Sequence, residues 1–250
     1  MIISKNKIKF IHSLELKKNR KESNLFVAEG NKLVSEALSS MHCDTLVATS
    51  EWFEQHPLAH APEMLEADKE MMNKVSFLKT PQEVLGLFEM PSHTLSAGSL
   101  KSRLSLVLDT IQDPGNLGTI IRLADWFGIE DIICSPETAD CYAPKTVQAT
   151  MGAIARIRVH YTPLIPFLEQ MKGVPVYGTY LEGDNIYQQN LSPNGLIVMG
   201  HEGRGIAPEL DPFMTKKLHI PSYPHNRETS ESLNVAIATS IICSEFRRRM

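Results

Sequence analysis

The second half of the chain alternates short apolar segments with segments of helical periodicity, and this alternation limits the fold more than any other feature. LSLVLDT (104–110) is followed by NLGTIIRLADWFG, IEDIICS, APKTVQATMGAIA and RIRVHYT. The alternation continues through PLIPFLEQMKG, VPVYGTY and GLIVMG to a last helix from about Val235. Strands without a polar face are typical of a parallel sheet with helices on both faces. We therefore predict an α/β domain with a mostly parallel sheet from residue 104 onward.

The first 90 residues predict a separate, smaller α/β unit. Helical periodicity is expected in IKFIHSLELKKNR and NKLVSEALSS, and strands in LFVAEG, DTLVATS and EVLGLFEM. The segment APEMLEADKEMMNKV favours one or two helices. A stretch rich in Ser, Gly and Pro follows at 91–103. We place an N-terminal domain at 1–95, a linker at 96–103 and a C-terminal domain at 104–250.

Positive charge is concentrated near the N-terminus. The net charge of the chain is −4, yet residues 1–32 hold eight Lys or Arg against three Glu. Concentrated charge of one sign can direct an anionic partner to one face of a protein. On charge alone, a solvated helix face and a nucleic-acid contact weigh equally.

Several classes of protein are disfavoured by the sequence. No apolar run reaches the roughly 18 residues of a membrane span, and the basic N-terminus lacks the apolar core of a signal peptide. The four cysteines form no CxxC pair and the nine histidines are scattered. We expect a cytoplasmic protein with free thiols, no membrane partner and no metal site.

Two expected strand ends carry residues that a plain turn does not require, at the place where ligands bind in doubly wound folds. In DTIQDPGNLGTIIR, Pro114 and Gly115 turn the chain and Asn116 is expected to cap the helix, but Arg122 still needs an anionic partner. That partner is equally well a substrate or an acid of the same chain. In GHEGRG, Glu202 lies among glycines, in neither a dinucleotide fingerprint nor a P-loop.

A third polar cluster precedes the last helix. In SESLNVAIA, Ser230 or Ser232 is expected to cap the helix, and Asn234 then remains unexplained. The segment is either a helix cap alone or the wall of a site.

Taken in order, DPGNLGTIIRLADWFG, VMGHEGRGI and IP…SLNVAIA resemble motifs 1, 2 and 3 of the SpoU (TrmH-like) family of RNA 2′-O-ribose methyltransferases, within the SPOUT superfamily. LELKKNRKESNLFVAEGNKLVSEAL, with LKTPQEVLGLF, resembles the substrate-binding domain that often precedes this fold. The resemblance implies a small RNA-binding α/β domain and a C-terminal SPOUT domain. That domain would end in a deep trefoil knot, a rare exception to the rule against knots. It also implies a homodimer that methylates structured RNA, with rRNA favoured over tRNA.

The resemblance also assigns roles to individual residues. S-adenosylmethionine (AdoMet) would be held by Gly200, Glu202, Gly203, Ile220 and Leu233. Catalysis would involve Arg122, Asn116, Ser232, Asn234 and Glu202. Since the pKa of arginine exceeds about 12, we expect Arg122 to act electrostatically and not as a base. RNA contacts are expected from the basic helix, at Lys17, Lys18, Arg20 and Lys21.

Two departures from the family pattern leave an alternative open. His201 replaces an expected Asn or small residue, and the motif 3 loop (222–231) is long and lacks the usual Met and Gly. A catalytically inactive RNA-binding or ribosome-assembly protein on the same fold is therefore the second hypothesis. A nucleotide-dependent dehydrogenase is disfavoured, because no G-x-G-x-x-G follows the first strand of either half.

Overall fold

The computed structural model describes residues 3–224 and 232–248. The chain forms two compact units: the first joins Met1–Ser92 to Asp140–Arg156, and the second joins His93–Ala139 to Ile157–Met250. Both are α/β, which confirms the predicted fold class. Residues 140–156, expected in the C-terminal domain, cluster with the first unit, and the domain boundaries at 95 and 104 stay a prediction.

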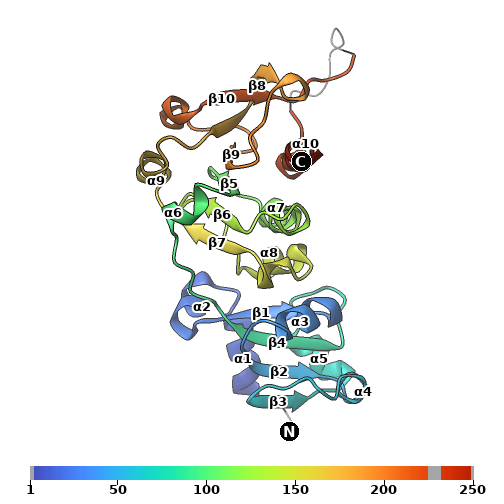
Figure 1. Cartoon of the computed structure of the whole chain (residues 1–250). Coiled ribbons are helices and arrows are strands. Elements are labelled where there is room, and N and C mark those ends of the chain that lie inside the picture. The colour runs from blue at the N-terminus through green and yellow to red at the C-terminus, as the bar shows by residue number, and fades with distance from the viewer. Residues whose placement is uncertain (1–2, 225–231, 249–250) are drawn as a thin grey trace. The chain divides into compact units, whose positions relative to one another are not determined.

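The first unit is built on a four-stranded sheet with the order β1-β4-β2-β3 (Figure 1). Its strands are β1 (Leu25–Glu29), β2 (Cys43–Ala48), β3 (Glu63–Glu66) and β4 (Val84–Glu89). Its helices in the first 92 residues are α1 (Lys5–Ser13), α2 (Lys17–Ser23), α3 (Asn31–Leu38), α4 (Ser50–Gln55) and α5 (Lys69–Val75). The expected helix over 61–75 is wrong in its first part, because residues 63–66 pair with β2 as a parallel strand. Pairing with a sheet edge overrides local propensity here.

A segment from the middle of the chain completes the first unit. Helix α8 (Pro144–Thr150) packs on β1, and the short 3-10 helix η1 (Ala153–Ala155) packs on α3. The expected single helix is broken at Met151 and Gly152, which both have positive φ. A Cβ atom at Gly152 would lie 2.9 Å from the Cβ of Glu36, so glycine permits this close approach of the segment to α3.

The second unit is built on a six-stranded sheet with the order β10-β8-β9-β5-β6-β7. All neighbouring strands are parallel, which confirms the predicted sheet, and β9 lies between β8 and β5 (Figure 1). The strands are β5 (Leu104–Leu108), β6 (Asp131–Cys134), β7 (Arg158–Tyr161), β8 (Val176–Asn185), β9 (Gly195–Met199) and β10 (Lys216–His219). The helices are α6 (Ala97–Leu100), α7 (Pro114–Trp126), α9 (Leu164–Gln170) and α10 (Val235–Arg248), with 3-10 helices η2 (Ile186–Gln188) and η3 (Pro208–Phe213).

Apolar packing fixes the central strands of this sheet. Val107 of β5 and Val198 of β9 are fully buried in a cluster that includes Phe167 of α9. Burial of each such side chain contributes about 1.5–3 kcal/mol. Helix α10 packs on α7, and the rings of Phe246 and Tyr177 lie 5.0 Å apart. The parallel pairing of β5 with β9, up to Leu108 and Met199, holds the ends of these two strands next to each other. Within the described residues, no helix combines the length and apolar character that a membrane crossing needs.

Candidate functional site

The carboxyl end of the six-stranded sheet brings together segments that are far apart in the sequence. Because the strands are parallel, β5, β9 and β10 all end on this side, just before Asp109, Gly200 and Ile220. The central pair is in direct contact: Leu108 is the register partner of Met199, and the Asp109 N–H donates to the Met199 carbonyl at 2.9 Å. This end is where the sequence predicted the site.

The glycine-rich segment after β9 forms a closed turn. The backbone N–H groups of His201 and Gly205 donate to each other's carbonyls at 2.9 and 2.8 Å. A Cβ atom at Gly200 would lie 2.2 Å from the Gly205 carbonyl carbon, so only glycine fits at this position. The His201 ring closes the turn, because its Nδ1 accepts the N–H of Gly203 at 2.9 Å and that of Arg204 at 3.3 Å. The departure at His201 therefore has a structural role.

Asn116 lies at the start of α7 but does not cap it, and that expectation is wrong. Asp113 is the cap, since its Oδ1 accepts the Asn116 N–H at 2.8 Å, with Pro114 in the first turn. The Asn116 side chain is therefore available to contact other segments. Its Nδ2 donates to Oε1 of Glu202 at 3.0 Å, and its Oδ1 accepts from Nδ2 of Asn234 at 2.9 Å.

Asn234 both caps α10 and contacts Asn116. Its Oδ1 accepts the N–H groups of Ala236 at 2.9 Å and Ile237 at 3.3 Å, which is the N-cap arrangement. The expected cap at Ser232 is therefore wrong, and Ser230 lies outside the described residues. A continuous hydrogen-bonded chain, Glu202–Asn116–Asn234, joins the three motif segments. Asn234 thus belongs to a helix cap and to this hydrogen-bonded chain at once.

Two of the expected catalytic residues lie outside this hydrogen-bonded chain. Arg122 is exposed on α7, six residues after Asn116, and has no hydrogen-bond or ion-pair partner in 3–224 or 232–248. Ser232 is exposed, two residues before Asn234. A cationic group without an internal partner at this position is available to an anionic ligand.

The expected cofactor residues flank the same chain of hydrogen bonds. Glu202 is half-buried and Gly203 is exposed in the turn after β9. Leu233 is 49% exposed beside Asn234, and Ile220 is half-buried one residue beyond β10, two strands away from β9. Backbone polar groups and apolar side chains together suit a ligand with both characters. The long motif 3 loop is described only to Pro224, and 225–231 lie outside the described residues.

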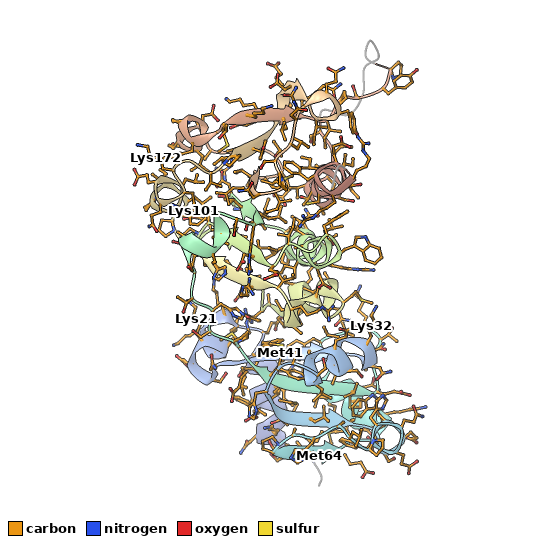
Figure 2. The ribbon with its side chains drawn as sticks, viewed as in Figure 1. Lys21, Lys32, Met41, Met64, Lys101 and Lys172 are labelled. Carbon is orange, nitrogen blue, oxygen red and sulfur yellow. The ribbon has the colours of Figure 1, made fainter. Side chains whose placement is uncertain are left out.

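The basic helix α2 divides into exposed and buried cations. Lys17, Lys18 and Lys21 are exposed, and Lys21 is labelled in Figure 2. Arg20 is only 2% exposed, because its guanidinium donates to the carbonyls of Leu14 and Glu15 and pairs with Asp140 at 2.7 Å. The expectation that Arg20 contacts RNA does not fit this position. Its interactions fix α2 to the 140–156 segment within the first unit.

One polar residue of the site was missed from the sequence. Asp109 is buried at the end of β5, and its Oδ2 accepts the N–H of Ala207 at 2.7 Å. Its Oδ1 accepts the Thr110 hydroxyl at 3.0 Å. The available signal was an acidic residue directly after a fully apolar strand.

Two family models match the chain. The SpoU rRNA Methylase family matches residues 103–244, and the MRM3-like substrate binding domain matches residues 5–86. The first match contains the whole carboxyl end of the six-stranded sheet, and the second contains the basic helix α2.

Similar proteins cover nearly the whole chain. The 23S rRNA (guanosine(2553)-2′-O)-methyltransferase RlmP of Bacillus subtilis is 32% identical over 96% of this chain and 96% of its own length. A TrmH-family structure from Porphyromonas gingivalis has a TM-score of 0.90 and 39% identity, and covers 100% of both chains. An AdoMet-bound rRNA methyltransferase from Sinorhizobium meliloti has a TM-score of 0.86 and 32% identity, over 100% of this chain and 97% of that one.

Proposed function

The chain belongs to the SpoU rRNA methylase family, and we propose that it transfers a methyl group from AdoMet to a ribose 2′-hydroxyl of ribosomal RNA. The observation that carries the proposal is the chain Glu202–Asn116–Asn234, which joins the three motif segments at the carboxyl end of the sheet. The similarity to RlmP and to the AdoMet-bound structure supports the same reaction class.

The residues at this end of the sheet fit AdoMet. The turn after β9 offers backbone groups at Gly200 and Gly203, which carry no side chains, and the exposed Leu233 next to Asn234 offers apolar surface. With Glu202 and Ile220, these residues would hold the cofactor. When bound, AdoMet supplies a methyl group already activated on a sulfonium, so the protein mainly aligns the acceptor and excludes water.

Arg122 is proposed to orient the RNA and stabilise charge. A ribose hydroxyl is a weak acid, and its oxygen becomes more nucleophilic as negative charge develops on it. A guanidinium cannot take the proton, but it stabilises that charge and binds a neighbouring phosphate. The exposure of Arg122 supports this role.

Asn116, Glu202, Asn234 and Ser232 are proposed to shape the acceptor pocket. The hydrogen bond to Glu202 orients the Asn116 amide with its NH2 group toward Glu202, and the amide oxygen of Asn116 then accepts from Asn234. Because Asn234 is held by α10, both amide side chains have one defined orientation. The exposed Ser232 hydroxyl is left to contact substrate or cofactor.

The first unit is proposed to bind the RNA. It contains the match to a substrate binding domain, and Lys17, Lys18 and Lys21 are exposed on α2. Phosphate contacts of this kind make binding depend on salt. Ribosomal RNA is preferred over transfer RNA, in line with the RlmP relative.

A homodimer and a C-terminal trefoil knot are part of the proposal. Exposed apolar side chains on the packed helices α7 and α10 support a subunit interface there: Trp126 is 83% exposed and Ile237 is 54% exposed. The knot is supported by the position of the last helix. Helix α10 follows the edge strand β10 in the sequence, yet it packs on α7, the helix that follows the central strand β5. The four cysteines are buried and form no disulfide with one another, which suits a reducing compartment such as the cytoplasm.

The test uses RNA from a strain that lacks the gene. Purified protein and methyl-labelled AdoMet are incubated with naked rRNA and with ribosomal subunits, and the product is mapped for 2′-O-methylation. We expect label at one ribose. RNA binding without label on any substrate would instead favour the catalytically inactive RNA-binding protein.

A further inference from the structure

Asp109 makes hydrogen bonds to both ends of the glycine-rich loop 200–207. Its backbone N–H donates to the carbonyl of Met199, the last residue before the loop, at 2.9 Å. Its side-chain Oδ2 accepts the N–H of Ala207, the last residue of the loop, at 2.7 Å. One residue directly after β5 thus holds the start and the end of the loop that carries Glu202 and Gly203.

The Asp109 carboxylate is itself held in place. It is 6% exposed, and its second oxygen accepts the Thr110 hydroxyl at 3.0 Å. Thr110 has a φ of 59°, which is unfavourable for a β-branched residue. Its N–H donates to Ser135 Oγ at 3.0 Å, and the Ser135 hydroxyl lies 3.2 Å from that of Thr138. Such a conformation persists only where surrounding bonds determine it.

The loop transmits the position of Ala207 to the site. Gly200 is packed so closely on the backbone of Gly205 and Ile206 that no Cβ would fit. A shift of Ala207 therefore moves the turn between them, including Glu202, which binds Asn116. Within the described residues, the hydrogen bonds of the Asp109 side chain go to Thr110 and Ala207 and not to Glu202 or Gly203.

We propose that Asp109 is a positioning residue that clamps the loop 200–207 and thereby sets the affinity for AdoMet. The proposal rests on the proposed function for the identity of the ligand. A hydrogen bond to a charged acceptor contributes more than a neutral one, and its loss leaves a backbone donor unpaired. The clamp predicts an effect on AdoMet binding and not on the chemical step at saturating cofactor.

The experiment compares Asp109→Ala and Asp109→Asn with Asp131→Ala. Asp131 is a matched control because it is also a buried carboxylate, 5% exposed, on the neighbouring strand β6 but at the opposite end of the sheet. Two quantities are measured on folded protein: the AdoMet Kd, and the hydrogen-exchange rate of the Ala207 amide in the absence of AdoMet. The AdoMet KM and kcat are measured alongside.

The proposal predicts that Asp109→Ala raises the AdoMet Kd and KM about 10- to 100-fold with little change in kcat. Asp109→Asn keeps a neutral acceptor, so about a 3- to 10-fold increase is expected. Ala207 exchanges faster in both variants, and Asp131→Ala changes stability but neither AdoMet affinity nor Ala207 exchange. If the alanine variant does not fold, the asparagine variant decides.

Wild-type affinity and Ala207 exchange in the Asp109→Asn variant would overturn the clamp. An equal loss of AdoMet affinity in Asp131→Ala would also overturn it, because the effect would then be general destabilisation. A wild-type protein that does not bind AdoMet would refute the proposed function instead, and Ala207 exchange would still test the clamp.

Discussion

The two ends of the six-stranded sheet each bury a carboxylate, but they surround it with different partners. Asp109 at the carboxyl end is 6% exposed and accepts a backbone N–H and a hydroxyl. Asp131 at the amino end is 5% exposed and is paired with the guanidinium of Arg158 at 2.8 and 2.7 Å and with His160 at 3.0 Å. Neutral donors hold the first carboxylate, and the guanidinium of Arg158, together with the ring of His160, holds the second.

The amino end is a closed network of charges. Arg158 also pairs with Glu130 at 2.8 Å, and Glu130 pairs with Arg103. Burial pushes the pKa of Asp131 up, but hydrogen bonds from Arg158 and His160 outweigh it and hold that pKa below its usual range. Hydrogen bonds to Asp131 and Glu130 raise the pKa of Arg158. Each charge is thus satisfied by its neighbours, as expected of a structural cluster.

We propose that the carboxyl end instead leaves a cation for a ligand. Asp109 and Glu202 are bound by neutral groups, and the cation Arg122 has no partner within the described residues. On this proposal, the same sheet uses charge pairing for stability at one end and neutral hydrogen bonds around a ligand site at the other. Substitutions should therefore separate activity from stability according to the end at which they fall.

The largest effect on activity is expected for Arg122→Ala. Loss of a group that stabilises developing charge lowers kcat by about 100- to 1000-fold, while AdoMet binding and the melting temperature change little because Arg122 is exposed. Radiolabel transfer and calorimetric AdoMet titration measure the two effects. Full activity in the variant would remove Arg122 from the mechanism.

Arg158→Ala tests the opposite end of the sheet. The variant leaves buried Asp131 without its guanidinium, which is expected to cost about 2–4 kcal/mol of unfolding free energy, allowing for the partial exposure of Arg158. Urea denaturation measures the loss, and kcat of the folded protein should stay within about twofold of wild type. A loss of kcat without loss of stability would contradict the structural role assigned to the amino end of the sheet.

The same network gives a pH dependence with a defined sign. Because the folded pKa of Asp131 is depressed, its contribution to stability is present above its unfolded pKa of about 3.9 and is lost as pH falls through the lower folded pKa. Arg158→Ala should therefore flatten the acid side of the stability profile relative to wild type. Parallel acid limbs for the two proteins would contradict the assigned ion pair.

Asn116→Ala removes the centre of the hydrogen-bonded chain between the motif segments. Losing the bonds to Glu202 and Asn234 is expected to lower kcat/KM by about 10- to 100-fold. Thr119→Ala is the matched control, because Thr119 is exposed on the same helix and its hydroxyl donates to the carbonyl of Gly115 within that helix. Equal behaviour of the two variants in steady-state kinetics would show that the chain is not functional.

The smallest effect on AdoMet affinity is expected for substitutions of His201, and its size should depend on whether the new side chain can accept a hydrogen bond. His201→Ala removes the acceptor for the N–H groups of Gly203 and Arg204 and should weaken AdoMet binding about 3- to 10-fold. His201→Asn should retain wild-type affinity, because a side-chain oxygen can accept the same N–H. A titration in which Asn behaves like Ala would exclude this role for the ring.

The strand-helix alternation correctly predicted the parallel sheet, because apolar runs and glycine-rich turns are local signals. The partners of Asn116 and Asn234 were not predictable, since Asp113 and not Asn116 caps α7, and the amides meet only after folding. Burial of Arg20 depends on Asp140, 120 residues away. The packing of residues 140–156 on β1 is likewise a tertiary contact between segments far apart in the sequence, and no local pattern predicts it.

The most direct test of the difference between the two ends is an NMR titration with AdoMet, read at backbone amides. We predict that the largest chemical-shift changes occur at the carboxyl end, at the amides of Gly200, Gly203 and Leu233. The amide resonances of Asp131 and Arg158 at the amino end should not shift. Saturable binding with the largest shifts at Asp131 and Arg158 would contradict the assignment of the site.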